Sequence, residues 1–377
     1  MGFCHQFRWL IPFEIVAARS CPPPARFDCM ENIMIRRLLA LSVVVAVLTP
    51  AVVVHADTVY FTSKTTGGLY SFDTSGTAIT QIAANNTFTS PTALALGPDG
   101  NLYIGDGVGG GRVARYVMTT GSVATVVSLA GSGPASPGAL AFRTSAQGGQ
   151  MLVGRNPETA FFSYPTGPVL EVSGWNTGQT PSVQAYTTGA SVDYSPGLAV
   201  AADGTLYVSN SLYNIATLAM TGNVLKFDSS GTLQAEVTAD GSGSGGLFGP
   251  AGLAIVGNSL FVASTMDGSI YKTNLLDPSI ATNTTFFAMT PLDPASNYPD
   301  FIGPLAAMSD GGLLTGGVAS SGLIYHFDAT GSLQHVFGDA SYGAVGGIVA
   351  VPEPSAALLA LAGVSCAGLW RSWRRKA

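Results

Sequence analysis

DGNLYI (Asp99–Ile104) and DGTLYV (Asp203–Val208) are two copies of one pattern, a turn dipeptide followed by large apolar side chains. Looser copies are GNSLFV (Gly257–Val262) and DGGLL (Asp310–Leu314). Asp-Gly and Gly-Asn favour two-residue hairpin turns, because these turns need positive φ, which glycine and asparagine tolerate. Each copy therefore predicts a hairpin turn and the strand that follows it.

A second pattern, of small residues followed by apolar ones, precedes these hairpins and returns at roughly 45 to 60 residues, the scale of propeller blades. Its copies are PTALAL (91–96), PGALAF (137–142), PGLAV (196–200), PAGLAI (250–255), GPLAA (303–307) and GIVA (347–350).

A third pattern ends a strand in an aspartate-glycine turn. Its copies are LYSFDTSG (69–76), VLKFDSSG (224–231) and IYHFDATG (324–331).

The order of the three patterns predicts units of four antiparallel strands, which are the blades of a β-propeller. The motif order resembles NHL-type repeats and their six-bladed relatives over most of residues 57–350. The resemblance implies an all-β, six-bladed β-propeller. The stretch from Met151 to Thr188 lacks a clean Asp-Gly turn, and only its spacing assigns it to a blade.

The two ends of the repeat region are complementary. Thr58–Phe61 matches a second strand, and the missing first strand returns at Gly347–Val351. We expect the C-terminal strand to pair into the first blade, which would close the ring and remove its open edges.

The N-terminal region has the pattern of a secretory signal peptide at residues 34–56. Met34 and two arginines precede an apolar stretch, and small residues at Val54 and Ala56 predict cleavage after Ala56. Residues 1–33 hold three of the four cysteines and lie upstream of this complete signal. We interpret them as translation from too early a start, the true start being Met30 or Met34. A long, genuine n-region is the alternative.

The last 27 residues, 351–377, have three parts: a proline-bracketed glutamate, an apolar run (Ala356–Trp370) and a basic end. Prolines keep the backbone extended, the run of about 15 residues is long enough to lodge in a bilayer, and terminal cations stay at the cytoplasmic face. The motif residues are Val351, Pro352, Glu353, Pro354 and Ser355, and the basic residues are Arg371, Arg374, Arg375 and Lys376.

This tail resembles the PEP-CTERM sorting signal. The resemblance implies an exosortase-type membrane protease as a partner and transient anchoring in the inner membrane by a transmembrane segment. It also implies export to the outer surface or extracellular matrix of a Gram-negative-type bacterium. The alternative is an ordinary membrane anchor that is never cleaved.

The charge of the region between these ends excludes one class of partner. Of 16 basic and 22 acidic residues in the chain, 7 basic and 18 acidic lie in residues 57–350, a net charge of about −11. An acidic domain is a poor nucleic-acid binder. It also holds no cysteine, so disulfides do not stabilise it.

Catalytic chemistry has weak support in the sequence. Gluconolactonase-like propellers resemble this chain in architecture, and that resemblance implies a calcium-type cation held by oxygen ligands at one channel mouth. Asp106, Asn210 and Asp267 follow second strands and are the metal candidates. The alternative is that they cap strand ends by side-chain hydrogen bonds. No glutamate falls on a first strand, where this family would need one.

The remaining titratable candidates are His326 and His335, which we interpret as half-exposed strand residues. We therefore expect a non-enzymatic surface or matrix propeller, without a cofactor, whose loops meet extracellular polysaccharide or another surface protein. The alternative is a secreted metal-dependent hydrolase or lactonase.

Overall fold

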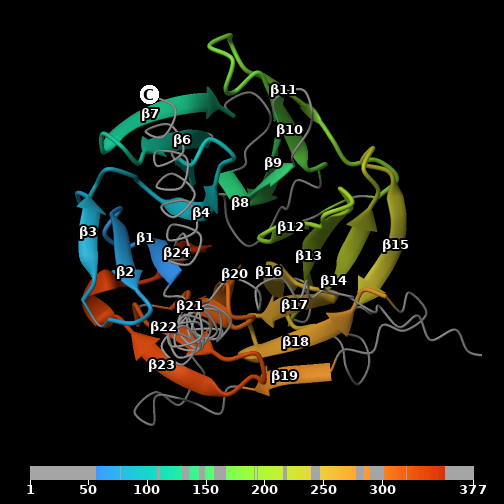
Figure 1. Ribbon diagram of the computed structural model, residues 1–377. Helices are drawn as coiled ribbons and strands as arrows, with labels where there is room; N and C mark the ends of the chain where they lie inside the picture. The colour runs from blue at the N-terminus through green and yellow to red at the C-terminus, as the bar shows by residue number, and fades with distance from the viewer. Residues whose placement is uncertain are drawn as a thin grey trace, which may run out of the picture. The chain divides into compact units, whose positions relative to one another are not determined.

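Six four-stranded antiparallel sheets form a ring in the computed structural model (Figure 1). The structure describes residues 57–352, except 77, 108–110, 130–135, 144–148, 157–166, 191, 193, 215–218, 239–246, 277–283, 289–300 and 320. This ring belongs to the compact unit His55–Pro354. The predicted all-β, six-bladed propeller is therefore confirmed.

Each blade runs from an inner first strand to an outer fourth strand. Blade 1 is β24 (Val345–Pro352), β1 (Asp57–Ser63), β2 (Leu69–Asp73) and β3 (Thr80–Ala83). Blade 2 is β4 (Pro91–Leu96), β5 (Leu102–Asp106), β6 (Arg112–Val117) and β7 (Ser122–Ser128). Blade 3 is β8 (Ser136–Arg143), β9 (Gln150–Asn156), β10 (Leu170–Ser173) and β11 (Ser182–Ala185).

The other three blades follow the same order. Blade 4 is β12 (Leu198–Val200), β13 (Leu206–Asn214), β14 (Ala219–Phe227) and β15 (Leu233–Thr238). Blade 5 is β16 (Pro250–Val256), β17 (Ser259–Ser264), β18 (Ser269–Asn274) and β19 (Thr284–Ala288). Blade 6 is β20 (Ile302–Ala307), β21 (Leu313–Gly317), β22 (Ile324–Phe327) and β23 (Leu333–Phe337). A single turn of 3-10 helix, η3 (Ala340–Tyr342), precedes β24.

The predicted hairpin turns lie between the first and second strands. Their glycines, Gly100, Gly204, Gly257 and Gly311, have φ values of 74°, 85°, 56° and 86°. Blade 3 lacks the Asp-Gly pair, but Gly149, with a φ of 74°, directly precedes β9. The blade that was assigned by spacing therefore has the same turn requirement, met by a different sequence.

The first and last strands close the ring as predicted. Strand β24 is the inner strand of blade 1 and pairs antiparallel with β1, with Val59 opposite Ala350 and Phe61 opposite Ile348. The pairing continues two residues past the predicted domain end, because Val351 and Pro352 lie opposite Thr58 and Asp57. The first two residues of the predicted sorting motif are therefore part of the closing strand.

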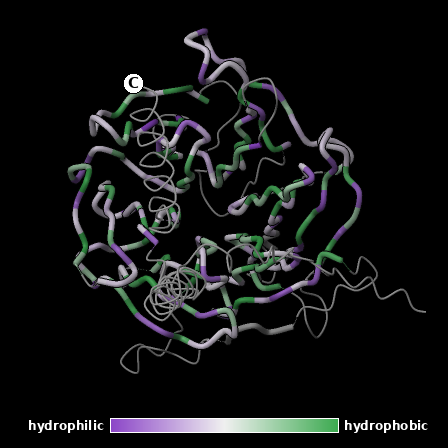
Figure 2. The backbone as a smooth tube through the Cα atoms, in the orientation of Figure 1, coloured by the Kyte–Doolittle hydropathy of each residue, from purple (hydrophilic) through white to green (hydrophobic). Residues whose placement is uncertain are grey.

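The hydrophobic core lies between neighbouring blades. Tyr103 of blade 2 packs edge-on against Trp175 of blade 3, with ring centroids 5.2 Å apart. Phe72 of blade 1 packs against Phe337 of blade 6, with centroids 4.5 Å apart. Figure 2 shows hydrophobic segments recurring in every blade around the ring. Buried aromatic area of this kind stabilises the ring without disulfides.

The small residues of the second pattern allow the first strands to approach one another closely. A Cβ atom added at Gly197 would lie 2.0 Å from the carbonyl oxygen of Ala251 in the next blade. One added at Gly347 would lie 2.5 Å from the backbone nitrogen of Leu94. The pattern thus reflects steric limits at the centre of the ring.

The predicted targeting segments lie outside the described residues. They are the upstream extension 1–33, the predicted signal peptide 34–56 with its predicted cleavage site at Ala56, and the tail from residue 353 onward. Among residues that the structure does describe, there is no helix of the length and apolarity that a membrane span requires.

Candidate binding site at the channel mouth

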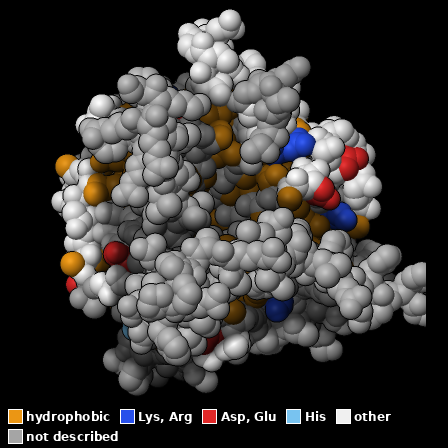
Figure 3. Space-filling model, viewed as in Figure 1, with side chains coloured by type: hydrophobic (Ala, Val, Ile, Leu, Met, Phe, Trp, Pro, Cys, Tyr) orange, Lys and Arg blue, Asp and Glu red, His pale blue; other side chains and the backbone are white. Residues whose placement is uncertain are grey.

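A cavity of about 200 Å³ lies where the first strands of the six blades begin. Every blade contributes to its lining, through residues 92–94, 138–140, 196–198, 249–253, 303–305 and 346–348. Most of these residues are Gly, Ala, Pro or Leu, so the wall is largely main chain and aliphatic carbon. Figure 3 shows hydrophobic side chains toward the middle of this view of the ring.

A second group of lining residues lies in or just beyond the second strands. Lys64, Ser211, Thr265 and Val318 contribute to the cavity. Lys64 and Thr265 each come directly after the last residue of their second strand, β1 and β17. The end of each second strand pairs with the start of the first strand, as Ser264 does with Pro250. Lys64 and Thr265 lie one residue beyond such a pair.

Lys64 carries the charge of the site. It is the only charged residue among the described residues that line the cavity. Its backbone N–H donates to the carbonyl oxygen of Ala344, at 2.8 Å, which fixes the start of its side chain beside β24. Burial lowers the pKa of the Lys64 ammonium from its ordinary value. Within the described residues, no carboxylate lies at ion-pair distance from it.

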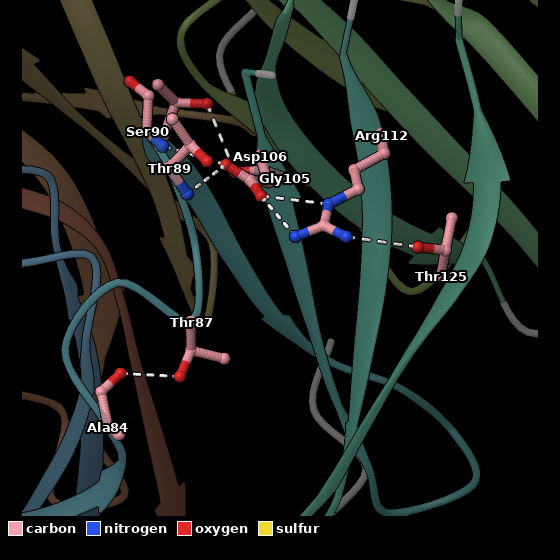
Figure 4. A network of polar contacts seen from close by, with 9 residues as sticks. Ala84, Thr87, Thr89, Ser90, Gly105, Asp106, Arg112 and Thr125 are labelled. Carbon is pink, nitrogen blue, oxygen red and sulfur yellow. Dashed lines mark hydrogen bonds and ion pairs between the residues drawn. The ribbon is translucent and has the colours of Figure 1, made fainter. Parts of the chain in front are cut away.

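The side chain of Asp106 lies at the end of β5, fully buried, and both of its oxygens are engaged (Figure 4). Oδ2 accepts from Arg112 Nη2 at 2.8 Å and Nε at 3.0 Å. Oδ1 accepts from the backbone N–H groups of Thr89 and Ser90, at 3.0 and 2.9 Å. Asp106 therefore joins the linker before β4 to the second and third strands of blade 2.

The other two metal candidates also have partners within their own blades. Asn210 Nδ2 donates to Asn223 Oδ1 at 3.0 Å, between β13 and β14. Asp267 lies in the turn between β17 and β18, where it accepts from the backbone N–H of Ser269, at 3.0 Å, and the hydroxyl of Tyr271, at 2.8 Å. Burial, together with this contact, raises the pKa of Tyr271 to about 12.

Asp106, Asn210 and Asp267 do not line the cavity. Over the described part of the chain, no three His, Cys, Asp or Glu side chains come together as a metal site would require. The hydrogen bonds of Asp106 are those of the alternative named above, in which the side chain caps the end of a strand. The second-strand residues that do line the cavity are Ser211, Thr265, Val318 and Lys64, which lie in or just beyond β13, β17, β21 and β1.

The two histidines differ in exposure, contrary to the expectation of two half-exposed residues. His326 on β22 is 8% exposed, whereas His335 on β23 is exposed. They are directly opposite across the strands, with ring centroids 6.0 Å apart. Both ring nitrogens of His326 are buried without a hydrogen-bond partner, and burial lowers its pKa. Neither residue lines the cavity.

Lys64 was not predicted from the sequence, because the candidates there were oxygen ligands that follow second strands. The available signal was its rarity: Lys64 is one of only 7 basic residues in residues 57–350, and it directly follows the strand VYFTS (59–63). A basic residue at that position can reach the channel because the second strand ends beside the start of the first.

The comparisons with known proteins identify the architecture. No protein-family model matches the chain, and no curated protein is significantly similar to it. A chain in the crystal structure of the nidogen/laminin complex matches with a TM-score of 0.59 and 12% identity, over 78% of this chain and 98% of that one. A protein of unknown function from Bacteroides caccae matches with a TM-score of 0.52 and 13% identity, over 79% and 100%.

At these identities the likeness is one of fold alone. Together with the six sheets and their closure, it defines the chain as a six-bladed β-propeller protein. Propellers carry many unrelated functions, so function has to be argued from the site.

Proposed function

We propose that this chain is an exported, non-enzymatic binding propeller that a PEP-CTERM and exosortase-type system sorts to the bacterial surface or matrix. The observation that carries this proposal is the pairing of Asp57 with Pro352. Asp57 is the first residue after the predicted signal-peptide cleavage, and Pro352 is the second residue of the predicted sorting motif. Removing both targeting segments would therefore leave a complete, closed ring.

This pairing also constrains where the tail can be cut. Cleavage before Pro352 would remove residues that pair with β1, whereas cleavage after it leaves the closing strand whole. Asp57 and Pro352 lie opposite each other at one end of the paired strands β1 and β24, so both predicted targeting segments join the described ring at the same place. The partner in this step is an exosortase-type protease.

The geometry of the channel mouth supports binding rather than catalysis. Its wall is largely main chain and aliphatic carbon, with a few hydroxyl groups and one ammonium group. The carboxylate of Asp106, the strongest candidate for acid or metal chemistry, is already held by Arg112 and two backbone N–H groups. We propose extracellular polysaccharide or another surface protein as the partner of the ring.

The experiment that tests the proposed sorting follows both ends of the protein. The full chain would be produced in a bacterium that has an exosortase-type protease and in the same strain without it. Mass spectrometry of the surface fraction should find a chain that starts at Asp57 and lacks Trp370 and the basic end. In the strain without the protease, the tail should remain and the protein should stay with the inner membrane. An intact tail in both strains would contradict the proposal.

A further inference from the structure

We propose that the channel-mouth cavity binds a hydroxylated monocarboxylate of the size of one sugar residue, with Lys64 as its counter-ion. A uronic acid is the simplest ligand of this class. The inference rests on the proposed function only in that both assign binding to the ring. It does not involve the sorting tail, so the two proposals can fail separately.

The first argument is charge. Lys64 is partly buried in a wall that is otherwise uncharged, and no described carboxylate lies within ion-pair distance. Partial burial removes some of the water that solvates an ammonium group, and a bound anion would offset that loss. One lysine compensates one negative charge, so the site fits a carboxylate group better than a dianionic group such as phosphate.

The second argument is the hydroxyl groups in the wall. Ser211 Oγ donates to the carbonyl oxygen of Pro250 at 2.6 Å, and the hydroxyl of Thr92 donates to the carbonyl oxygen of Pro137. A hydroxyl whose hydrogen is engaged still offers oxygen lone pairs as acceptors. Such a wall favours a ligand that donates hydrogen bonds, as sugar hydroxyls do.

The third argument is size and surface. The cavity, at about 200 Å³, is smaller than the roughly 300 Å³ at which drug-sized pockets begin, so it suits a single ring. Its aliphatic parts, such as Leu94, Leu198 and Ile348, would contact the C–H faces of that ring. A hydroxylated ring with one carboxylate combines all three requirements.

Binding should depend on pH in a defined direction. The anion binds best to the protonated lysine, so it raises the pKa of Lys64 in the complex. The affinity should therefore fall as the pH rises through the pKa of free Lys64, which burial has lowered. A ligand held only by hydroxyl contacts would show no such loss.

The experiment is calorimetric titration of the full chain, purified in detergent, with galacturonate, galactose, acetate and polygalacturonate. Galacturonate should bind, whereas galactose lacks the charge and acetate lacks the hydroxyls, so each should bind at least tenfold more weakly. Polygalacturonate distinguishes the source: binding as tight as that of the free acid indicates a polymer ligand, and much weaker binding indicates a free sugar acid. Equal binding of galactose and galacturonate would overturn the proposal.

The matched variants are Lys64→Met and Lys226→Met. Lys226 lies on β14, away from the cavity, so its loss changes the net charge equally without touching the site. Lys64→Met should weaken galacturonate binding at least tenfold, and Lys226→Met should leave it unchanged. Unaltered binding in Lys64→Met would overturn the proposal. If that variant does not fold, the pH profile of the unmodified chain decides: affinity that is constant from pH 6 to pH 10 overturns it.

Discussion

The carboxylate of Asp57 accepts two hydrogen bonds from Ser309, a residue 252 positions further along the chain. The backbone N–H of Ser309 lies 2.8 Å from Oδ2, and its hydroxyl oxygen lies 2.6 Å from Oδ1. Asp57 begins the second strand of blade 1, and Ser309 lies between the first two strands of blade 6. The ring is therefore closed twice, by strand pairing within blade 1 and by this contact between blades.

Replacing Asp57 with alanine should lower the free energy of unfolding by about 2 kcal/mol, because hydrogen bonds to a buried carboxylate are worth about 1.5–3 kcal/mol. Asp57 is fully buried, so water cannot substitute for it. Chemical denaturation would measure the loss. Glu236→Ala on the outer strand β15 is the control, because Glu236 is exposed. Equal stability of the two variants would contradict the role of the contact.

The end of the closing strand can be tested by truncation. A chain that ends at Ala350 should melt at a lower temperature than one that ends at Pro352. The shorter chain loses the pairs of Val351 with Thr58 and of Pro352 with Asp57. We expect a difference of about 1 kcal/mol, the size of one net hydrogen bond, since proline has no N–H to donate. Identical melting temperatures would mean that Val351 and Pro352 do not contribute to the stability of the ring.

Gly197→Ala should be strongly destabilising, by about 3 kcal/mol, because the added Cβ would lie 2.0 Å from the carbonyl oxygen of Ala251. Relief of this overlap requires blades 4 and 5 to move apart. Gly76→Ala is the control, since its nearest atom would be 3.8 Å away. Thermal unfolding compares the two. Similar melting temperatures would mean that neighbouring blades separate easily.

The sequence predicted the fold well because the blade is a local unit. Turn glycines such as Gly100 and Gly204 need positive φ, and small residues such as Gly197 are needed at the centre of the ring. Both requirements act within a few residues and repeat from blade to blade. The turn residues and small residues therefore recur at regular spacing in the sequence. Closure by β24 could be predicted because the first blade lacked one strand of that period.

The candidate site was less predictable from the sequence, because it depends on which of two adjacent residues at the end of a second strand faces the cavity. Asp106 ends β5 and faces Arg112, whereas Lys64, one residue past the end of β1, lines the cavity. A shift of one residue along a strand exchanges the two faces, and the sequence pattern does not fix that register at strand ends. Contacts between distant residues, such as Asp57 with Ser309, leave no local pattern at all.

Calcium is expected to leave the melting temperature unchanged. The oxygens of Asp106 already accept from Arg112, Thr89 and Ser90, and Asp267 accepts from the Tyr271 hydroxyl. A cation bound to the folded ring at about 100 times its dissociation constant would instead add roughly 2.7 kcal/mol. Melting curves with calcium, with magnesium and with chelator make the test. A rise in calcium alone would restore the metal hypothesis for these residues.

His326 should make the ring less stable in mild acid. Burial is the main cause that lowers its pKa, and the nearby carboxylate of Asp310 opposes the shift only in part. Below about pH 6.5 the unfolded chain takes up a proton on this histidine, whereas the folded chain does so only at a lower pH. Between the two pKa values the unfolded state binds more protons, so the free energy of unfolding falls as the pH falls through that window.

The matched variant for this prediction is His326→Phe, which keeps a flat ring beside His335 and removes the titrating group. Urea unfolding between pH 7.5 and pH 5 should show a steeper loss of stability in the unmodified chain than in the variant. The exposed His335 is present in both proteins, so the comparison isolates the loss of His326 together with its repulsion of His335. Parallel stability curves would mean that another group controls the acid response. A steeper curve in the variant would mean that the charged form of His326 stabilises the fold.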